Sequence, residues 1–363
     1  MTKPAQPRGL PLLSLAILAG LLALAVDSMH RQLRRNNLAE LVAPLLDPSD
    51  TRVRKRFTGL QGLDGFLTKL LILFMPVFTG EMPELTLFAF HFSGQMVAVV
   101  VFLTVQGLRQ GTRRSPARFA TLWAIVMQVV GYGVVMPLYC LLDLVFSSSG
   151  PGSAGLTDPA RLHAIVPAVG LGFVLPSVLQ ALPLGQDLHQ KLVAVWQAFP
   201  IYVGYLGWIF SQAIKRTVPT ATNKKKSAVD KEALDHACGF AISVGAVTHW
   251  ATMGVIAAAT FYAGLFPAGV ADSFTFANVF VPHPPRWYGT VTIASTMMQF
   301  LHYDLYVGAG ATLVWAATQA NRAGAWSLDV GGIARIARDV LVLGPVSAAV
   351  SVLRSRDQAV LGP

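Results

Sequence analysis

The amino-acid sequence predicts an all-α protein, a polytopic transmembrane helical bundle of about eight or nine spans. Hydrophobic residues make up 53% of the 363 positions and charged residues only 13%, about half the roughly 25% typical of soluble proteins. Apolar runs of about 20 residues recur along the whole chain, and each can cross a hydrocarbon core about 30 Å thick. Because a chain in lipid must satisfy its backbone hydrogen bonds internally, and these runs are too long for barrel strands, helices are predicted.

The first apolar run covers residues 10–26 and follows a short basic stretch. It is interpreted either as a signal peptide or as a short first span, and we favour the span. Residues 27–59 are rich in arginine and are expected to form a solvated basic connector. We therefore predict an N-terminal part, 1–59, that holds an anchor or signal-like segment and this connector, followed by the transmembrane helical bundle, 60–355.

The remaining candidate spans follow one another with short connections. They cover residues 60–79, 85–107, 118–146, 163–182, 188–213, 237–266, 289–317 and 333–353. The turn at residues 80–84 is so short that the two helices beside it must be antiparallel. Several spans contain proline, which kinks a helix and opens cavities unless neighbouring helices close them. The prolines are Pro137, Pro167, Pro176 and Pro200.

The formal net charge of +10 is carried mostly by the connecting segments. Basic residues beside membrane spans set topology and attract anionic lipid headgroups, so we predict the lipid bilayer, and no nucleic acid, as a partner. The basic segments 27–59 and 214–231 fall on opposite sides if every run spans once, so charge bias alone does not orient the chain. Cys140 and Cys238 lie in or beside apolar runs, which disfavours a disulfide or a zinc site.

The run 289–317 carries a cluster of polar side chains where lipid disfavours them. Gln299, His302, Tyr303 and Tyr306 share one helical face, and Asp304 lies near the middle of the run. A carboxyl removed from water stays protonated near neutral pH, which makes it a competent general acid. The alternative is a structural aspartate bonded to a neighbouring helix.

Other polar residues lie at similar depth in their runs, and an intramembrane ionisable group is a functional candidate by default. Interhelical hydrogen bonds are the alternative for each, and Asp143 is a second candidate acid. We predict Asp304, His302, Tyr303 and His249 as catalytic residues. We predict His91, Gln95, Gln128, Gln197 and Tyr306 as substrate-binding residues. No metal ligands are predicted.

Familiar cofactor signatures are missing from the sequence. It has no paired aspartate motif for magnesium diphosphate, no glycine-rich nucleotide loop before a helix, no histidine-rich iron pattern and no nucleophile elbow. No cofactor is therefore predicted, and what remains is acid and base chemistry on an apolar molecule.

Several segments together resemble a known family. They are LDGFLTKLLILFMPVFTG (63–80), HFSGQ (91–95) with the later basic turn GLRQGTRR (107–114), MPLY (136–139), VLPSVLQALP (174–183), WQAFP (196–200) and FLHYDLYVGAGATLVWA (300–316). In their order and spacing, over about residues 60–320, they resemble the membrane-bound noncanonical terpene cyclases of fungal meroterpenoid biosynthesis, of the ascochlorin, ascofuranone and macrophorin type.

This resemblance implies cyclisation of a farnesyl-type chain on a prenylated aromatic or quinone-like small molecule. The reaction would start by protonation of an epoxide or a terminal olefin, without loss of diphosphate. The resemblance carries over Gln95, Gln197 and Asp304, with Asp304 as proton donor, and implies a fungal protein in the endoplasmic reticulum membrane.

Two other functions remain as alternatives. A transporter of a lipophilic metabolite should show repeated halves or broken helices at matching positions, and the sequence shows neither. A non-catalytic membrane scaffold in a secondary-metabolite pathway would not need the polar residues at 299–306.

Overall fold

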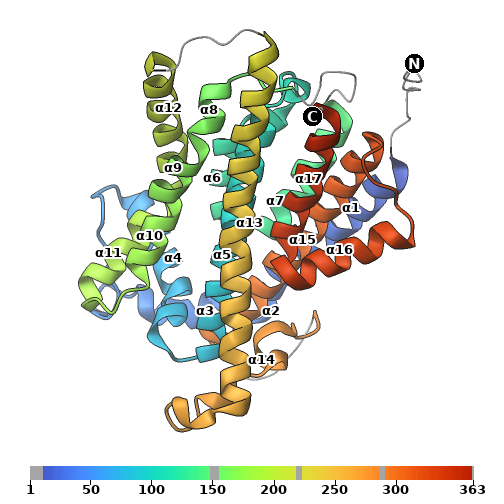
Figure 1. Ribbon diagram of the computed structural model, residues 1–363. Helices are drawn as coiled ribbons and strands as arrows, with labels where there is room; N and C mark the ends of the chain where they lie inside the picture. The colour runs from blue at the N-terminus through green and yellow to red at the C-terminus, as the bar shows by residue number, and fades with distance from the viewer. Residues whose placement is uncertain (1–10, 148–154, 218–222, 286–290, 362–363) are drawn as a thin grey trace.

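The computed structural model describes residues 11–147, 155–217, 223–285 and 291–361, and the regular elements in these ranges are all helices. Figure 1 shows them as one bundle in which the long helix α13 runs from end to end. The elements are α1 (Leu12–Ala25), η1 (Val26–Arg31), α2 (Gln32–Arg35), α3 (Leu38–Leu46), α4 (Gln61–Thr79), α5 (Pro83–Gly107), η2 (Gln110–Thr112), η3 (Pro116–Arg118), α6 (Ala120–Val130), α7 (Tyr132–Phe146), α8 (Pro159–His163), α9 (Ile165–Val169), η4 (Gly170–Val174), α10 (Leu175–Gln180), α11 (Gln186–Trp196), α12 (Phe199–Thr217), α13 (Asn223–Phe261), η5 (Ala263–Leu265), η6 (Ala271–Ser273), α14 (Phe276–Phe280), α15 (Ile293–Arg322), α16 (Val330–Leu343) and α17 (Pro345–Leu361).

The centre of the bundle is built by five helices. Helix α13 packs against α5 and α17, and α15 packs against α7 and α17. The core is apolar and continuous across them, with the largest fully buried side chains including Trp315, Tyr132 and Phe88. Close approach of α7 and α15 depends on Gly308, since a Cβ there would overlap the ring of Tyr132.

The N-terminal helix belongs to this bundle. Helix α1 packs against α7 and α15, and the helical path continues through the π-helix η1 into α2. The prediction that a solvated connector begins at residue 27 is therefore wrong in its first part. The helical stretch Leu12–Arg35 is long and apolar enough to cross a membrane.

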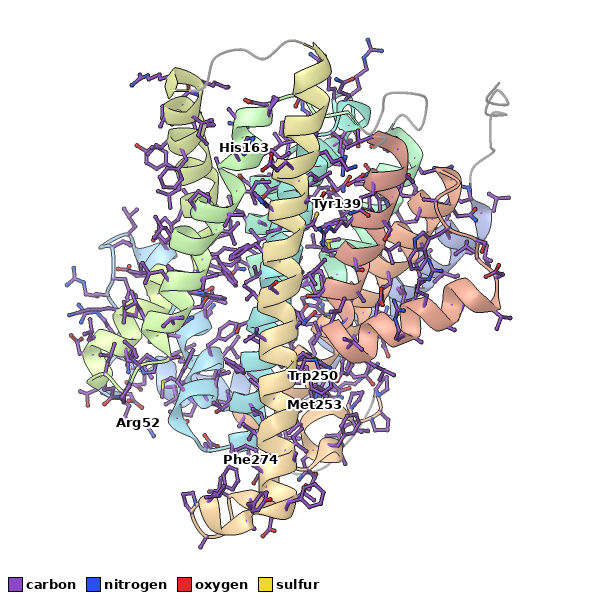
Figure 2. The ribbon with its side chains drawn as sticks, in the orientation of Figure 1. Arg52, Tyr139, His163, Trp250, Met253 and Phe274 are labelled. Carbon is purple, nitrogen blue, oxygen red and sulfur yellow. The ribbon has the colours of Figure 1, made fainter. Side chains whose placement is uncertain are left out.

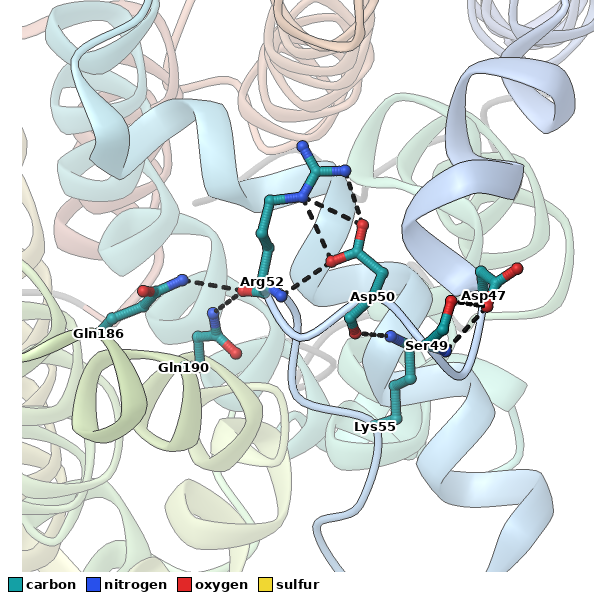
Figure 3. Close-up of polar contacts among 7 residues, drawn as sticks. All are labelled: Asp47, Ser49, Asp50, Arg52, Lys55, Gln186 and Gln190. Carbon is teal, nitrogen blue, oxygen red and sulfur yellow. Dashed lines mark hydrogen bonds and ion pairs between the residues drawn. The ribbon is translucent and has the colours of Figure 1, made fainter.

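The later part of the connector is docked rather than free (Figure 3). Gln186 and Gln190 of α11 both donate to the carbonyl oxygen of Arg52 at 2.8 Å. The Arg52 guanidinium donates two hydrogen bonds to Oδ2 of Asp50, one of 3.0 Å from Nε and one of 2.6 Å from an Nη atom. This hydrogen bonding lowers the pKa of Asp50.

Two of the predicted spans are broken at a glycine. The run 118–146 is two helices, α6 and α7, that meet at Gly131, and the run 333–353 lies in α16 and α17, which meet at Gly344. Both glycines have positive φ, +92° and +83°, a conformation that other residues avoid. The run 188–213 is also bent, by 63° between α11 and α12.

The number of membrane spans is lower than predicted when each helix is judged by length and composition. Among the described residues, four helices are long and apolar enough to cross a membrane, or five if the bent pair α11 and α12 is counted once. The sequence predicts more because it does not reveal the breaks, and because the run 289–317, which lies in the unbroken helix α15, is not among these four. The all-α class is confirmed, and the division at residue 60 stays a prediction.

The two ends of the bundle both carry basic segments. Arg52 lies at the lower end and His163 at the upper end in Figure 2. Near the upper end, the buried side chains of Arg109 and Arg356 both pair with Asp357. The pair between Arg109 and Asp357 fixes helix α17 to the segment that follows α5.

Candidate active site

One face of α15 binds the backbone of a single segment, residues 279–284, which we call the strap. The hydrogen bonds run from His302 Nε2 to Val279 O (2.8 Å), from Tyr306 OH to Phe280 O (2.6 Å), from Tyr303 OH to His283 O (2.9 Å) and from Gln299 Nε2 to Pro284 O (3.4 Å). Because a carbonyl oxygen only accepts hydrogen bonds, each side chain is the donor. The predicted shared face is confirmed, whereas the strap that covers it has no signature in the sequence.

Three buried histidines gather beside this face, and we call them the histidine cluster: His91, His249 and His302. The ring centroids of His91 and His249 are 5.2 Å apart. The ring of Phe88 connects His302 to this pair, since its centroid lies 4.4 Å from that of His302 and 6.2 Å from that of His91. Phe280 of the strap packs at 5.2 Å from His91. Helices α5, α13 and α15 therefore bring together residues from three separate predicted spans.

The hydrogen bonds of the cluster fix the chemistry of its nitrogen atoms. His249 Nε2 lies 3.0 Å from Leu341 O, so Nε2 carries the hydrogen and Nδ1 of the neutral ring is left as an acceptor. Among the described residues, no group bonds to the buried Nδ1 atoms of His91 and His249 or to Oε1 of Gln299. Buried polar atoms usually have partners, so these three atoms are free to bind a polar ligand.

Asp304 lies at the break between α6 and α7. Its side chain is buried, and its Oδ1 accepts a hydrogen bond from Gly133 N in the first turn of α7 at 2.7 Å. A Cβ on Gly131 would lie 2.7 Å from both Asp304 Oδ1 and Met29 Cε, and 3.3 Å from Phe300 Cζ. The glycine thus makes room for the carboxyl beside two apolar side chains.

The opposite side of the same break is closed by His30, which the sequence analysis missed. His30 Nε2 lies 2.9 Å from Val130 O, the last carbonyl of α6. The two residues are 100 positions apart, so no local pattern connects them. The break therefore has a hydrogen-bond donor, His30, at the end of α6 and a carboxyl, Asp304, at the start of α7. Each binds a kind of backbone group that helix ends leave without a partner.

The second break, between α16 and α17, is closed by other predicted site residues. Gln95 Oε1 accepts from Val346 N and Ser347 N at 3.0 and 3.1 Å, and Gln95 Nε2 donates to Leu343 O and Gly245 O at 3.3 and 3.1 Å. Trp250 Nε1 donates to Val342 O at 2.9 Å, next to the Leu341 carbonyl bound by His249. The last three carbonyls of α16 thus each have a side-chain partner.

The predicted site residues do not form one constellation. Successive helical residues turn by 100°, so Asp304 points about 160–200° away from His302 and Tyr306 on α15 and faces α7 instead. Gln197 is buried at the bend between α11 and α12, where neither of its amide atoms has a partner among the described residues. Gln128 is half-buried on α6.

The packing around these groups is tight. Two cavities of about 620 and 510 Å³ are lined by neither Asp304 nor the histidine cluster. No group of three or more His, Cys, Asp or Glu side chains in the described ranges is placed to hold a metal ion. The buried Nδ1 atoms of His91 and His249 are reached only when neighbouring side chains, or the strap, move.

The fold and the site together define a class: an all-helical protein with several helices able to cross a membrane and with carboxyl, imidazole and phenol groups buried between them. The CtvD domain family matches residues 8–361 of this chain. Terpene cyclase ctvD of Aspergillus terreus is 31% identical over 325 residues, covering 84% of this chain and 86% of that protein. Terpene cyclase ascI of Acremonium egyptiacum is 29% identical over 364 residues, covering 94% and 91%.

A third relative, terpene cyclase janA of Penicillium janthinellum, is 27% identical over 320 residues, with coverage of 84% and 83%. The chain belongs to the CtvD domain family, and the predicted resemblance to fungal meroterpenoid terpene cyclases is confirmed. No solved structure matches the chain.

Proposed function

We propose that this protein is a membrane-embedded terpene cyclase that closes rings in the farnesyl-type chain of a prenylated aromatic or quinone-like substrate. The observation that carries the proposal is the buried carboxyl of Asp304, held by one oxygen at the start of α7. Membership of a family whose named relatives are terpene cyclases supports it.

The membrane location follows from the helices and from the substrate. An isoprenoid substrate partitions into the lipid bilayer, so an enzyme embedded in the bilayer meets that substrate already concentrated. We propose a multi-pass protein of the endoplasmic reticulum membrane with up to eight or nine crossings. In this proposal the shorter apolar helices α6, α7 and α9–α10 add to the crossings made by the four long helices.

The position of Asp304 favours proton donation. Its Oδ1 is engaged by the Gly133 N–H, so the proton belongs on Oδ2. Burial beside Met29 and Phe300 disfavours the charged form before reaction. Transfer of that proton to the epoxide oxygen breaks the C–O bond, and the alkene electrons close the ring. The negative charge left on Asp304 then meets the N–H groups and the positive end of α7, which stabilises it as it forms.

Cyclisation ends with loss of a proton, and this step needs a base. Once Asp304 has given up its proton, its carboxylate is itself a base in the same site and can take up the proton that the cation loses. The histidine cluster lies on the other side of α15, and it is a second candidate site because Nδ1 of His249 is a buried acceptor on a ring fixed by Leu341 O. Tyr303 and Tyr306 hold the strap beside it.

The test uses microsomes that contain the protein, incubated with a prenylated phenol and with its terminal epoxide. A cyclase yields a product of unchanged mass with a new ring. We expect Asp304→Asn to lower turnover at least a hundredfold, the order of magnitude that a positioned general acid contributes. The amide keeps an oxygen for the Gly133 N–H and loses the proton.

The matched variant is Asp143→Asn, since Asp143 is also a buried carboxyl, bonded to Trp315 Nε1 at 2.8 Å. Activity above about a tenth of wild type in Asp304→Asn would remove Asp304 from the role of acid. Loss of activity in Asp143→Asn alone would move that role to Asp143, and loss in His249→Phe alone would move the site to the histidine cluster.

A further inference from the structure

An apolar groove runs along the bundle between α5, α6, α9 and α12. It has a volume of about 620 Å³ and is lined by side chains such as Val100, Leu103, Ile165 and Val203. Exposed apolar side chains flank it, including Leu122 and Ile201, which are 56% and 55% exposed. A surface of this kind faces lipid in a membrane protein, so the groove opens to the hydrocarbon.

One end of the groove continues into a smaller polar pocket of about 340 Å³. The two hollows share Gly107 and Arg118, and the pocket is also lined by Gln110, Arg113 and Thr157. Gly107 lets the chain pass closely here, since a Cβ would lie 3.0 Å from Arg118 O. Apolar and polar parts therefore form one continuous site.

The polar end is strongly basic. Arg113, Arg118 and Arg161 line the two hollows, and no aspartate or glutamate is among their lining residues. The Arg118 guanidinium is held in place, since it lies 4.4 Å from the centre of the Phe119 ring and donates to Arg113 O at 3.0 Å. Among the described residues that line the two hollows, the ordered positive charge of Arg118 therefore faces no carboxylate.

The geometry matches the depth profile of a bilayer. The groove follows the last turns of α5 from Val100 to the C-cap Leu108, and Arg113 and Arg118 lie in the segment after that helix ends. Eight residues of helix rise about 12 Å, which is a large part of one leaflet's hydrocarbon. The arginines are then at headgroup level, where basic side chains bind anionic lipid.

We propose that this groove and pocket are a binding site for an anionic phospholipid, with an acyl chain in the groove and the phosphate at Arg113 and Arg118. The cyclase substrate fits less well, because no acid lines the groove to start its reaction. The site is separate from Asp304 and the histidine cluster. The test of this lipid site is therefore independent of the test of the proposed reaction.

The test compares phosphatidic acid with phosphatidylcholine of the same acyl chains, added to the full-length protein in mild detergent, with bound lipid counted by native mass spectrometry. We expect preference for phosphatidic acid in the wild type. The double variant Arg113→Gln/Arg118→Gln should bind it roughly thirtyfold more weakly, from about a fivefold loss for each arginine removed at a lipid headgroup. The matched control is Arg34→Gln/Arg56→Gln, two exposed arginines elsewhere on the molecule.

A third variant tests the groove itself. Gly207 lines it, and a Cβ there meets only Ala168 Cβ, at 3.8 Å, so Gly207→Leu is the variant chosen to fill the groove. It should weaken the binding of both lipids. Equal binding of the two lipids by the wild type, unchanged preference in the Arg113→Gln/Arg118→Gln variant, or equal occupancy by soluble glycerol phosphate would each overturn the proposal.

Discussion

At the scale of single residues, the buried polar side chains of this protein bind backbone groups more than one another. Gln95, Asp304 and His302 each hydrogen-bond a peptide N–H or carbonyl of another segment. Helix ends leave such groups without partners, and lipid offers no water to replace them. The same side chains are therefore needed for the fold, so a loss of activity on substitution must be separated from a loss of stability.

Gln95 provides the clearest test of this structural role. Replacement of Gln95 by Leu removes an acceptor for Val346 N and Ser347 N and a donor for Leu343 O. We expect Gln95→Leu to destabilise the protein by roughly 3 kcal/mol, because buried backbone groups are left without partners. Thermal unfolding in detergent measures this loss of stability as a lower melting temperature.

The control for this variant is Gln128→Leu, since Gln128 is half-buried on α6. A melting temperature of Gln95→Leu equal to that of Gln128→Leu would contradict the role of Gln95 at the break.

At the scale of elements, glycine decides where two apolar runs stop being single helices. Gly131 and Gly344 adopt positive φ, and each lies against the side chain that closes its break: a Cβ would meet Asp304 at the first and Gln95 at the second. A break of this kind exposes peptide groups inside the bundle. It allows a carboxyl or an amide from another helix to be held at a helix end.

Gly344→Ala should disturb the second break from within. The new Cβ overlaps Gln95 Nε2 and the residue must adopt a φ that alanine avoids, so we expect a loss of roughly 3 kcal/mol in stability. Gly20→Ala on α1 is the control, because a Cβ there has no neighbour within 4 Å and should change stability by less than about 1 kcal/mol. Denaturant or thermal unfolding compares them, and equal effects would refute the argument.

The strap provides an element-scale prediction about motion. Tyr303 and Tyr306 donate to His283 O and Phe280 O, so the variant Tyr303→Phe/Tyr306→Phe removes two of the four bonds that hold it. We expect amide hydrogens of residues 276–283 to exchange about tenfold faster. Hydrogen exchange followed by mass spectrometry measures this.

Tyr205→Phe is the matched control for the strap variant, since Tyr205 is 61% exposed on α12. Unchanged exchange in the double variant would show that the strap is held by its apolar contacts, such as Phe280 against His91.

At the scale of the whole molecule, the bundle has two ends that both carry arginine. The segment around Arg52 lies at one end, and the turn after α5 lies at the other, near the helix that ends at His163. Lys and Arg near spans attract anionic lipid on either face, so charge bias cannot orient this chain.

Cysteine labelling tests this arrangement directly. Cys140 and Cys238 are buried, so single cysteines introduced by Ser49→Cys and Arg114→Cys, both at exposed positions, should be the reactive ones. In sealed microsomes a membrane-impermeant maleimide should label one variant, and the other only after permeabilisation. Labelling of both in sealed vesicles would show that the two ends lie on one side.

The sequence by itself determined the all-α class, the positions of most helices and the membership of a terpene cyclase family, because hydrophobic composition and local motifs are properties of the chain. It also found the shared face of Gln299, His302, Tyr303 and Tyr306, since helical periodicity is local. It did not reveal the breaks at Gly131 and Gly344, because an apolar run reads the same whether or not it is interrupted.

Only the tertiary structure decided which buried groups meet. It placed His30 at Val130 O and Gln95 at the α16–α17 break, contacts between residues 100 and about 250 positions apart. It also set Asp304 on the face of α15 that turns away from the histidine cluster. Such pairings depend on how helices pack in space, and the free energy that selects them comes from satisfying peptide groups at helix ends, which no local pattern encodes.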